Sequence, residues 1–251
     1  MTKNYNGVAR CALMVHGAGG GGWEWNIWQR VFAAHGWQVS APDLQPAESG
    51  LSATRIEHYI EQVSIWLKQS PSIGAASPPV LIGASLGGLL TLHAATSNAL
   101  AALVLINPIA PATIASARID ARPPTRAYPS IVRWGSERSI ASTLRAMPDA
   151  DDAVRLFALR RWRDESGSVL NAAAEGLHLQ RVRCPTLVIA SEHDVDTPPA
   201  ASYALADACA AEFRLLPGAS HLTPLLGRRA GAVAEQALRW CLQRGTNSLY
   251  G

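Results

Sequence analysis

The sequence predicts an α/β fold in which a mostly parallel central sheet is covered by helices on both faces. Short apolar runs alternate with helix-like segments along most of the 251 residues, as is typical of parallel strands buried on both sides. A hydrophobic fraction of 48% and a charged fraction of 16% suit a globular chain. Strand signals are missing from 111–180, so we expect a core of 1–110 and 181–251 with a helical cap of 111–180 inserted into it.

Six apolar runs are expected to form the sheet. They lie at Ala12–Val15, Trp37–Ala41, Val80–Ile82, Ala102–Ile106, Thr186–Ala190 and Phe213–Leu216. Helices are expected over Asn26–His35, over Thr54–Leu67, where apolar residues recur at helical spacing, and over Ala230–Leu242. Thr54 with Glu57 favours a capping box at the start of the second of these helices.

Ser85 lies at the centre of a Gly-x-Ser-x-Gly pattern. A strand-like run precedes the pattern and a helix-like run follows it, so Ser85 is expected on a tight turn that exposes its Oγ at the end of the sheet. Gly83 and Gly87 lack the Cβ atoms that would crowd this turn. The context favours a nucleophile over an incidental serine in a glycine-rich turn.

A serine hydroxyl needs a base to activate it, and the base needs an acid to orient it. Asp194 follows the strand-like run Thr186–Ala190, with Glu192 and Asp196 as alternative acids. His221 lies in the loop after the last predicted strand and is the expected base, the alternative being an ordinary loop histidine. The three groups occur in the order serine, acid, histidine.

These three motifs, in this order and spread over nearly the whole chain, resemble the α/β-hydrolase superfamily. The resemblance implies the α/β-hydrolase fold, with Ser85 as nucleophile, His221 as general base and then acid, and Asp194 as the residue that stabilises the imidazolium. In the family pattern the acid precedes a proline by four residues. Pro198 fills that place here and favours Asp194 among the three acids.

An oxyanion hole is the fourth expected part, because acyl transfer places negative charge on a carbonyl oxygen. The N–H of Leu86, directly after the nucleophile, is the first expected donor. Resemblance to the family's His-Gly-x motif makes the N–H of Ala18 the second, with Gly19 as the nearby alternative. His16 is expected to hold this glycine-rich loop in place, and the loop lacks the Lys-Ser/Thr ending of a phosphate-binding loop.

Trp23 and Trp25 follow the glycine-rich loop. With the stretches 41–44 and 49–50, they are similar to the plant methylesterase and hydroxynitrile lyase branch of the superfamily, in which the equivalent residues read Trp-Cys-Trp. Gly19, Trp23 and Trp25 are therefore expected to contact substrate, although both tryptophans could instead pack a helix against the core. Glu24, between them, departs from the pattern of that branch.

Lyase chemistry in that branch uses a lysine near the triad. Lys3 and Lys68 are the only lysines of the chain, and both are badly placed for that role. The sequence therefore favours hydrolysis over lyase activity.

Composition excludes several other classes of protein. A net charge of +3 without a basic stripe does not indicate nucleic-acid binding. No apolar run approaches the ~18 residues that span a bilayer, and the first residues lack the apolar stretch of a secretory signal. Four cysteines without paired or metal-type spacing favour reduced thiols and a cytoplasmic protein. No metal or organic cofactor is implied.

Half of the arginines lie in the cap. They include Arg155, Arg160, Arg161 and Arg163. The planar guanidinium suits an anionic partner, such as a substrate with a distal carboxylate or an acidic phosphopantetheine carrier protein. The alternative is a solvated helix face, which the flanking acidic residues favour. These are Asp149, Asp151, Asp152, Asp164 and Glu165.

Taken as a set, the motifs predict a serine hydrolase that cleaves small-molecule carboxylic esters through an acyl-enzyme intermediate. The same triad also supports a thioesterase, a carrier-protein-linked ester hydrolase, a carbon–carbon hydrolase or a hydroxynitrile lyase-like enzyme, since the fold does not fix the function. A slow-turnover ligand-binding receptor is the alternative outside enzymes.

Overall fold

The computed structural model describes residues 10–70, 78–111, 127–177 and 181–247, with the side chains of residues 245–247 left out of the description. Its central sheet has six strands in the order β2-β1-β3-β4-β7-β8, and each neighbouring pair is parallel. The strands are β1 (Cys11–Val15), β2 (Gln38–Ser40), β3 (Val80–Ala84), β4 (Ala102–Ile106), β7 (Thr186–Ser191) and β8 (Glu212–Leu216). The predicted parallel sheet is confirmed, and each strand falls on one of the six apolar runs.

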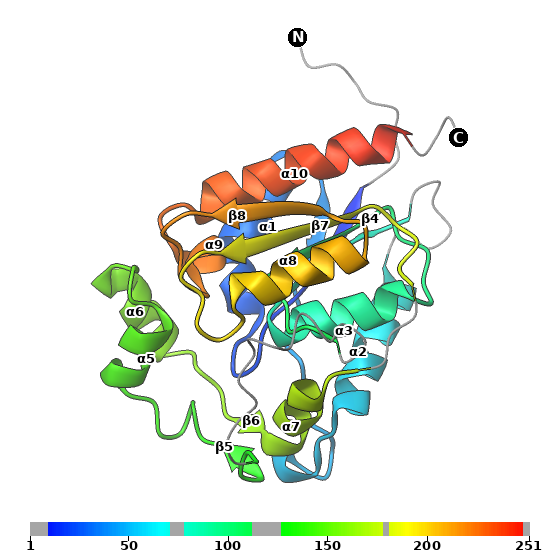
Figure 1. Cartoon of the computed structure of the whole chain (residues 1–251). Coiled ribbons are helices and arrows are strands. Elements are labelled where there is room, and N and C mark those ends of the chain that lie inside the picture. Colours follow the sequence, from blue (N-terminus) through cyan, green and yellow to red (C-terminus); the bar gives the residue numbers. More distant parts are fainter. Residues whose placement is uncertain (1–9, 71–77, 112–126, 178–180, 248–251) are drawn as a thin grey trace.

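Helices cover both faces of the sheet (Figure 1). On one face lie α1 (Asn26–Ala34) and α10 (Ala230–Asn247), and on the other lie α2 (Ile56–Gln69), α3 (Leu86–Ala95) and α8 (Pro199–Ala208). Alternate residues of a strand enter different apolar clusters, so Met14 packs with Trp28 and α10, while Leu13 packs with α2 and α3. Burial on both faces explains why the strands are continuously apolar.

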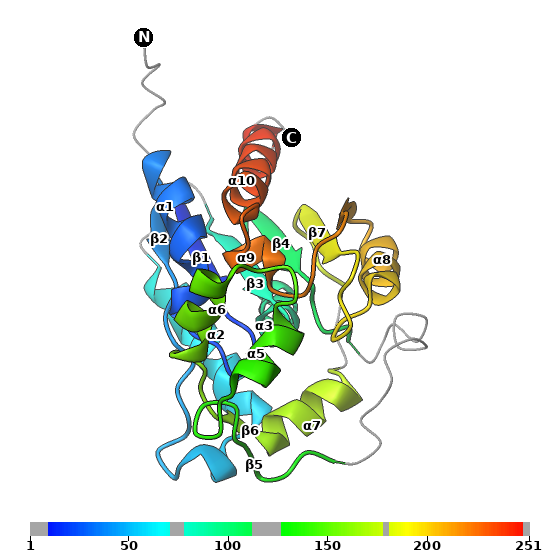
Figure 2. The same ribbon diagram turned by 90° about the vertical axis from the view of Figure 1, so that its left-hand side faces the viewer.

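Five short elements between β4 and β7 form the described part of the predicted cap. They are β5 (Ile131–Val132), α5 (Ile140–Ala146), α6 (Asp152–Leu159), β6 (Glu165–Ser166) and α7 (Gly167–Glu175). The arrowheads of β7 and β8 point toward α5 and α6 in Figure 1, and both helices lie in front of the sheet in Figure 2. The cap segment therefore lies at the carboxyl edge of the sheet, where loops carry ligand sites in such folds.

The cap differs from the sequence prediction in one respect, because β5 and β6 pair as antiparallel strands. Two-residue strands are too short to show an alternating pattern, which explains why the sequence showed none. Residues 112–126 and 178–180 lie outside the described part of the chain, so the cap limits of 111–180 stay a prediction.

The predicted capping box of Thr54 and Glu57 is wrong. The Thr54 hydroxyl accepts the N–H of Ala47 and donates to the carbonyl of Gly50, so it belongs to the preceding loop, which includes the 3₁₀ turn η2 (Leu51–Ala53). The helix begins two residues after Thr54, at Ile56, and Arg55 is its N-cap. Within the described ranges, no helix has both the length and the apolar character needed to cross a bilayer.

Candidate active site

Ser85 occupies a sharp turn between the end of β3 and the start of α3. Its backbone has φ 52° and ψ −118°, a region that residues with a Cβ rarely adopt and that costs about 1–3 kcal/mol. The end of β4 holds this conformation from the neighbouring strand, because Ser85 N–H donates to Ile106 O at 3.0 Å and Ser85 O accepts from Ile109 N–H at 3.1 Å. The half-buried side chain is thereby fixed at the carboxyl edge of the sheet.

The glycine-rich loop after β1 lies directly against Ser85. A Cβ atom placed on Gly17 would be 3.1 Å from Ser85 Cβ and 3.7 Å from Ser85 Oγ. Leu86 supplies the first N–H of α3, at the positive end of the helix dipole. The loop that contains the predicted donor Ala18 therefore lies beside the serine, and the predicted donor Leu86 follows it directly in the chain.

Gly19 is held by the cap. Its backbone has φ 66°, which favours glycine, its N–H donates to Glu165 Oε2 at 3.1 Å, and its carbonyl accepts from Arg163 N–H at 2.8 Å. Glu165 is buried and also accepts from the Tyr59 hydroxyl at 2.9 Å. Since the N–H of Gly19 already has a carboxylate partner, the geometry favours Ala18 as the second oxyanion donor. The sequence did not indicate this role of Glu165, which appeared there only as one of the acidic residues beside the cap arginines.

His16 holds the other end of the same loop. Its Nε2 accepts the N–H of Leu44 at 2.9 Å, so Nδ1 carries the proton and donates to Gly17 O at 2.8 Å. Burial lowers the pKa of His16 to about 4. A neutral ring with both nitrogens bonded has a structural role, as the sequence indicated.

Glu24 is a buried carboxyl beneath this loop, in the short helix η1 (Gly22–Trp25). Its Oε2 accepts the N–H of Gly17 at 3.4 Å. Burial raises the pKa of Glu24 to about 8, although the Gly17 hydrogen bond and the nearby His221 act in the opposite direction. At neutral pH this side chain is therefore mainly a neutral acid.

Replacing Glu24 with glutamine is expected to remove a pH dependence of stability. Between pH 4.5 and about 8 the unfolded chain ionises this carboxyl while the folded chain keeps it protonated, so the free energy of unfolding falls as pH rises, by roughly 1.4 kcal/mol per unit. In Glu24→Gln this contribution should disappear, which leaves the shallower decline that His221 contributes above its ordinary pKa. Urea unfolding at pH 5, 6, 7 and 8 measures it, with exposed Glu61→Gln as control. If the free energy of unfolding had the same pH dependence in wild type and in Glu24→Gln, the raised pKa of Glu24 would be contradicted.

His221 and Asp194 form the acid–base pair of the site. They follow β8 and β7, and His221 Nδ1 lies 2.6 Å from Asp194 Oδ2. The other oxygen of Asp194 accepts the N–H groups of Asp196 and Thr197, both at 2.9 Å. The structure thus directs Asp194 at the imidazole, whereas the carboxylate of the alternative Glu192 accepts a backbone N–H in the next loop.

The electrostatics of this pair suit a base that becomes charged during a reaction. Burial by itself would lower the pKa of His221, but the charge and hydrogen bond of Asp194 outweigh it and raise that pKa above its ordinary value. Burial would raise the pKa of Asp194, but His221 and Thr197 hold it below its usual range. Asp194, Asp196 and His221 place ligand atoms within 4.8 Å of one another. Because two of them already share a short hydrogen bond, the set fits an acid–imidazole pair better than a metal site.

Asn107 connects the three loops of the site and was missed from the sequence. Its buried side chain donates from Nδ2 to His221 O at 2.7 Å and to Ser191 Oγ at 3.0 Å, while Oδ1 accepts Ser191 N–H at 2.7 Å. Its carbonyl lies 3.0 Å from Thr197 Oγ1. A φ of 44° places this residue in the left-handed region that asparagine tolerates. An asparagine directly after an apolar strand was the signal that could have identified it.

The two tryptophans of the loop have different surroundings. Trp23 packs edge-on against Phe157 at 5.7 Å and Trp162 at 5.5 Å, both from the cap. Trp25 is fully buried in the core and packs edge-on against Trp28 at 5.7 Å. The geometry favours core packing for Trp25 and a contact between loop and cap for Trp23.

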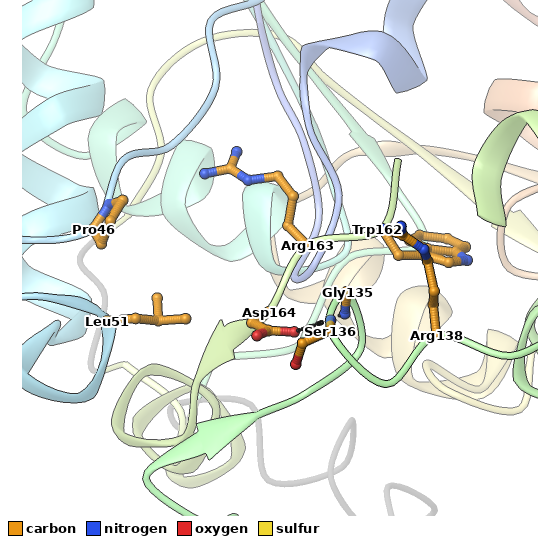
Figure 3. Close-up of a pocket in the computed structure, with 8 residues that line it drawn as sticks. All are labelled: Pro46, Leu51, Gly135, Ser136, Arg138, Trp162, Arg163 and Asp164. Atoms are coloured by element: carbon orange, nitrogen blue, oxygen red, sulfur yellow. Dashed lines mark hydrogen bonds between the residues drawn. The ribbon is translucent and has the colours of Figure 1, made fainter. Parts of the chain in front are cut away.

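Two surface hollows are lined by residues outside the triad. The first has a volume of 460 Å³ and lies between the cap and the loop before α2 (Figure 3). Asp164, which lines it, accepts the N–H groups of Gly135 and Ser136. The second, of 770 Å³, lies before β7. Its lining residues are Thr96, Arg181, Val182, Arg183, Cys184, Pro185 and Cys209. Neither hollow is lined by a triad residue, so neither defines the substrate pocket.

Three of the four cap arginines that suggested an anionic partner have partners within the chain. Arg155 bonds backbone carbonyls and Asp152, and Arg163 donates to Leu44 O at 2.7 Å. The guanidinium of Arg161 lies 3.8 Å above the ring of Phe157. These contacts favour structural roles for the cap arginines, and the idea of an acidic carrier protein gains no support from them.

Parallel strands, a serine on a left-handed strand-to-helix turn and an acid–imidazole pair at the same sheet edge are the features of an α/β-hydrolase. The chain belongs to the alpha/beta hydrolase family, whose model matches residues 12–236. No curated protein sequence matches it.

Solved structures share the fold at low sequence identity. A thermophilic esterase from Thermogutta terrifontis, with malate bound, is 21% identical with a TM-score of 0.68, over 95% of this chain and 92% of that one. A pyrethroid hydrolase from Sphingobium faniae is 19% identical with a TM-score of 0.69, over 93% and 97%. A variant of tomato methylketone synthase I, complexed with beta-ketoheptanoate, is 15% identical with a TM-score of 0.71, over 96% and 100%. At these identities the similarity establishes the fold alone.

Proposed function

We propose that this chain is a serine hydrolase that cleaves small-molecule carboxylic esters, with Ser85, His221 and Asp194 as its triad. The observation that carries the proposal is the 2.6 Å hydrogen bond between His221 and buried Asp194, at the edge where the strained turn presents Ser85. Neighbours described as an esterase and as a pyrethroid hydrolase have the same fold. All four cysteines are free thiols, which supports the cytoplasmic location proposed from the sequence.

Acylation begins when the Ser85 hydroxyl attacks the ester carbonyl carbon and passes its proton to Nε2 of His221. Asp194 accepts the hydrogen bond from Nδ1 and stabilises the imidazolium. The tetrahedral oxyanion accepts hydrogen bonds from the N–H groups of Leu86 and Ala18, which are fixed by α3 and by the glycine-rich loop. Collapse breaks the ester C–O bond, and the leaving alkoxide takes the proton from Nε2.

Deacylation repeats these steps with water as the nucleophile. His221 removes a proton from the water, which attacks the acyl carbon, and the same two N–H groups stabilise the second oxyanion. Ser85 recovers its proton from Nε2 as the carboxylic acid leaves. The neutral form of His221 is required at the start of each half-reaction.

A time course on p-nitrophenyl esters of increasing acyl length tests this function. Wild type is expected to show sustained turnover with an optimum at short to medium chains, and one equivalent of a fluorophosphonate should label Ser85. Ser85→Ala should lose both, whereas the exposed serine variant Ser52→Ala should keep both. A folded wild-type protein that neither turns over esters nor reacts with the phosphonate would reject the proposal.

A further inference from the structure

The carboxylate of Asp149 joins the cap to the loop that carries His221. Asp149, between α5 and α6, accepts hydrogen bonds from Ser220 Oγ and Thr223 Oγ1. Its Oδ2 also lies 3.3 Å from the backbone nitrogen of Ser220. Ser220 and Thr223 flank His221 in the chain, so the cap is bonded to both sides of the residue proposed as the base.

The turn that carries His221 orients the hydroxyl groups of Ser220 and Thr223 toward the carboxylate of Asp149. Ser220 N–H donates to Thr223 Oγ1 at 3.0 Å, and Thr223 N–H donates to Ser220 O at 3.2 Å. Both residues are buried, while Asp149 itself is exposed. From the core side, Asn107 donates to the carbonyl of His221. The backbone of the base is therefore fixed between a core amide and a cap carboxylate.

Asp149 is a charged acceptor at neutral pH. Partial burial would raise its pKa, but hydrogen bonds from Ser220 and Thr223 outweigh that effect and hold the pKa below its usual value. Hydrogen bonds to an ionised acceptor are roughly twice as strong as those between neutral groups. Two hydroxyl groups and a backbone N–H that is shared with Thr223 Oγ1 therefore join the turn 220–223 to this carboxylate.

The segment that carries Asp149 is itself held in place. Arg155 Nε donates to Met147 O at 3.1 Å, and its Nη2 donates to Pro148 O at 2.6 Å. The side chain of Met147 is buried in the apolar cluster beneath α1 and α10. Arg155 thus orients the two residues before Asp149, which gives a cap arginine a structural purpose that the sequence did not indicate.

We propose that Asp149 is a positioning residue for His221, so that the cap contributes to the chemical step as well as covering the site. The inference rests on the proposed Ser85–His221–Asp194 triad. Displacing a reacting group by about 1 Å can cost about 10²-fold in rate. Loss of the carboxylate should therefore lower kcat, whereas KM should stay near its wild-type value.

Steady-state kinetics of Asp149→Ala and Asp149→Asn test the proposal. For Asp149→Ala, kcat and the rate of phosphonate labelling of Ser85 should both fall roughly 10- to 100-fold, because both need the same base. Asp149→Asn should lie between this variant and wild type, since its amide oxygen still accepts one hydrogen bond. Glu137→Ala is the matched control, because it removes another exposed carboxylate of the cap. Glu137 forms an ion pair with Arg133 at 3.7 Å, and its variant should have the kcat and labelling rate of wild type.

A second readout does not depend on turnover. The proton shared by His221 Nδ1 and Asp194 should give a low-field ¹H NMR resonance, assigned by its loss in His221→Ala. In Asp149→Ala this resonance should broaden or exchange faster while the circular dichroism spectrum is unchanged. An unchanged resonance, an unchanged kcat, or a change in KM alone would overturn the proposal. If wild type neither turns over nor labels, the proposed function fails, and the resonance alone decides the role of Asp149.

Discussion

Ser85→Ala and His221→Ala should each lower kcat by roughly four to six orders of magnitude, and the double variant should be no slower than the worse single variant. Nucleophile and base act as a unit, so once either is absent the other contributes nothing further. The activity that remains should come from the N–H donors and from substrate binding. Single-turnover and steady-state rates on the best p-nitrophenyl ester measure the effect.

A stability control distinguishes this result from unfolding. The removal of Oγ from Ser85 leaves the backbone of the turn unchanged. The thermal midpoint of Ser85→Ala should therefore equal or exceed that of wild type, because catalytic side chains are often retained at a cost in stability. An additive loss in the double variant would mean that the two side chains act independently, and the triad assignment would then be wrong.

Asp194→Asn should lower kcat by roughly 10³–10⁴-fold and move the acid limb of the pH profile to lower pH. In wild type the Asp194 charge raises the pKa of His221, so the neutral base forms, and kcat/KM rises, only on the alkaline side of the usual histidine range. An asparagine lacks that charge, so the imidazolium is less stable and its pKa falls. The amide can also donate to Nδ1, which stabilises the wrong tautomer. Profiles of kcat/KM from pH 5 to 10 measure both effects.

Asp196→Asn is the matched control for this variant. Asp196 was an alternative acid in the sequence, is exposed, and contributes its backbone N–H to Asp194. Its variant should keep nearly full activity, and its pH profile should move less than that of Asp194→Asn, because the charge of Asp196 raises the pKa of His221 less than Asp194 does. Should Asp196→Asn lose activity while Asp194→Asn keeps it, the acid would have to be reassigned.

Local sequence signals predicted the fold because they do not depend on distant contacts. Continuous apolar runs identify strands buried on both faces, and all six lie in the parallel sheet. The Gly-x-Ser-x-Gly pattern likewise contains its own structural cause, since glycines on either side of Ser85 permit the tight turn. The boundaries were less accurate, as Thr54 shows, because a hydroxyl can bond the preceding loop as easily as the following helix.

The partners that hold the site could not be predicted from the sequence, because each contact joins residues far apart in the chain. Asn107 lies 114 positions before the residue whose carbonyl it bonds, and Glu165 lies 146 positions after Gly19. Asp149 and Glu165 looked like solvated charges beside arginines, and only the folded chain brings them to the histidine and glycine loops.

The sequence by itself therefore determined the parallel sheet, the turn at Ser85 and the order of the candidate triad, because hydrophobic period, glycine spacing and position after a strand are local properties. Only the tertiary structure decided which acid faces His221, which N–H of the glycine-rich loop is already occupied, and which cap residues contact the site. Those choices depend on hydrogen bonds between loops from different strands, and such bonds exist only once the sheet has brought the loops to one edge.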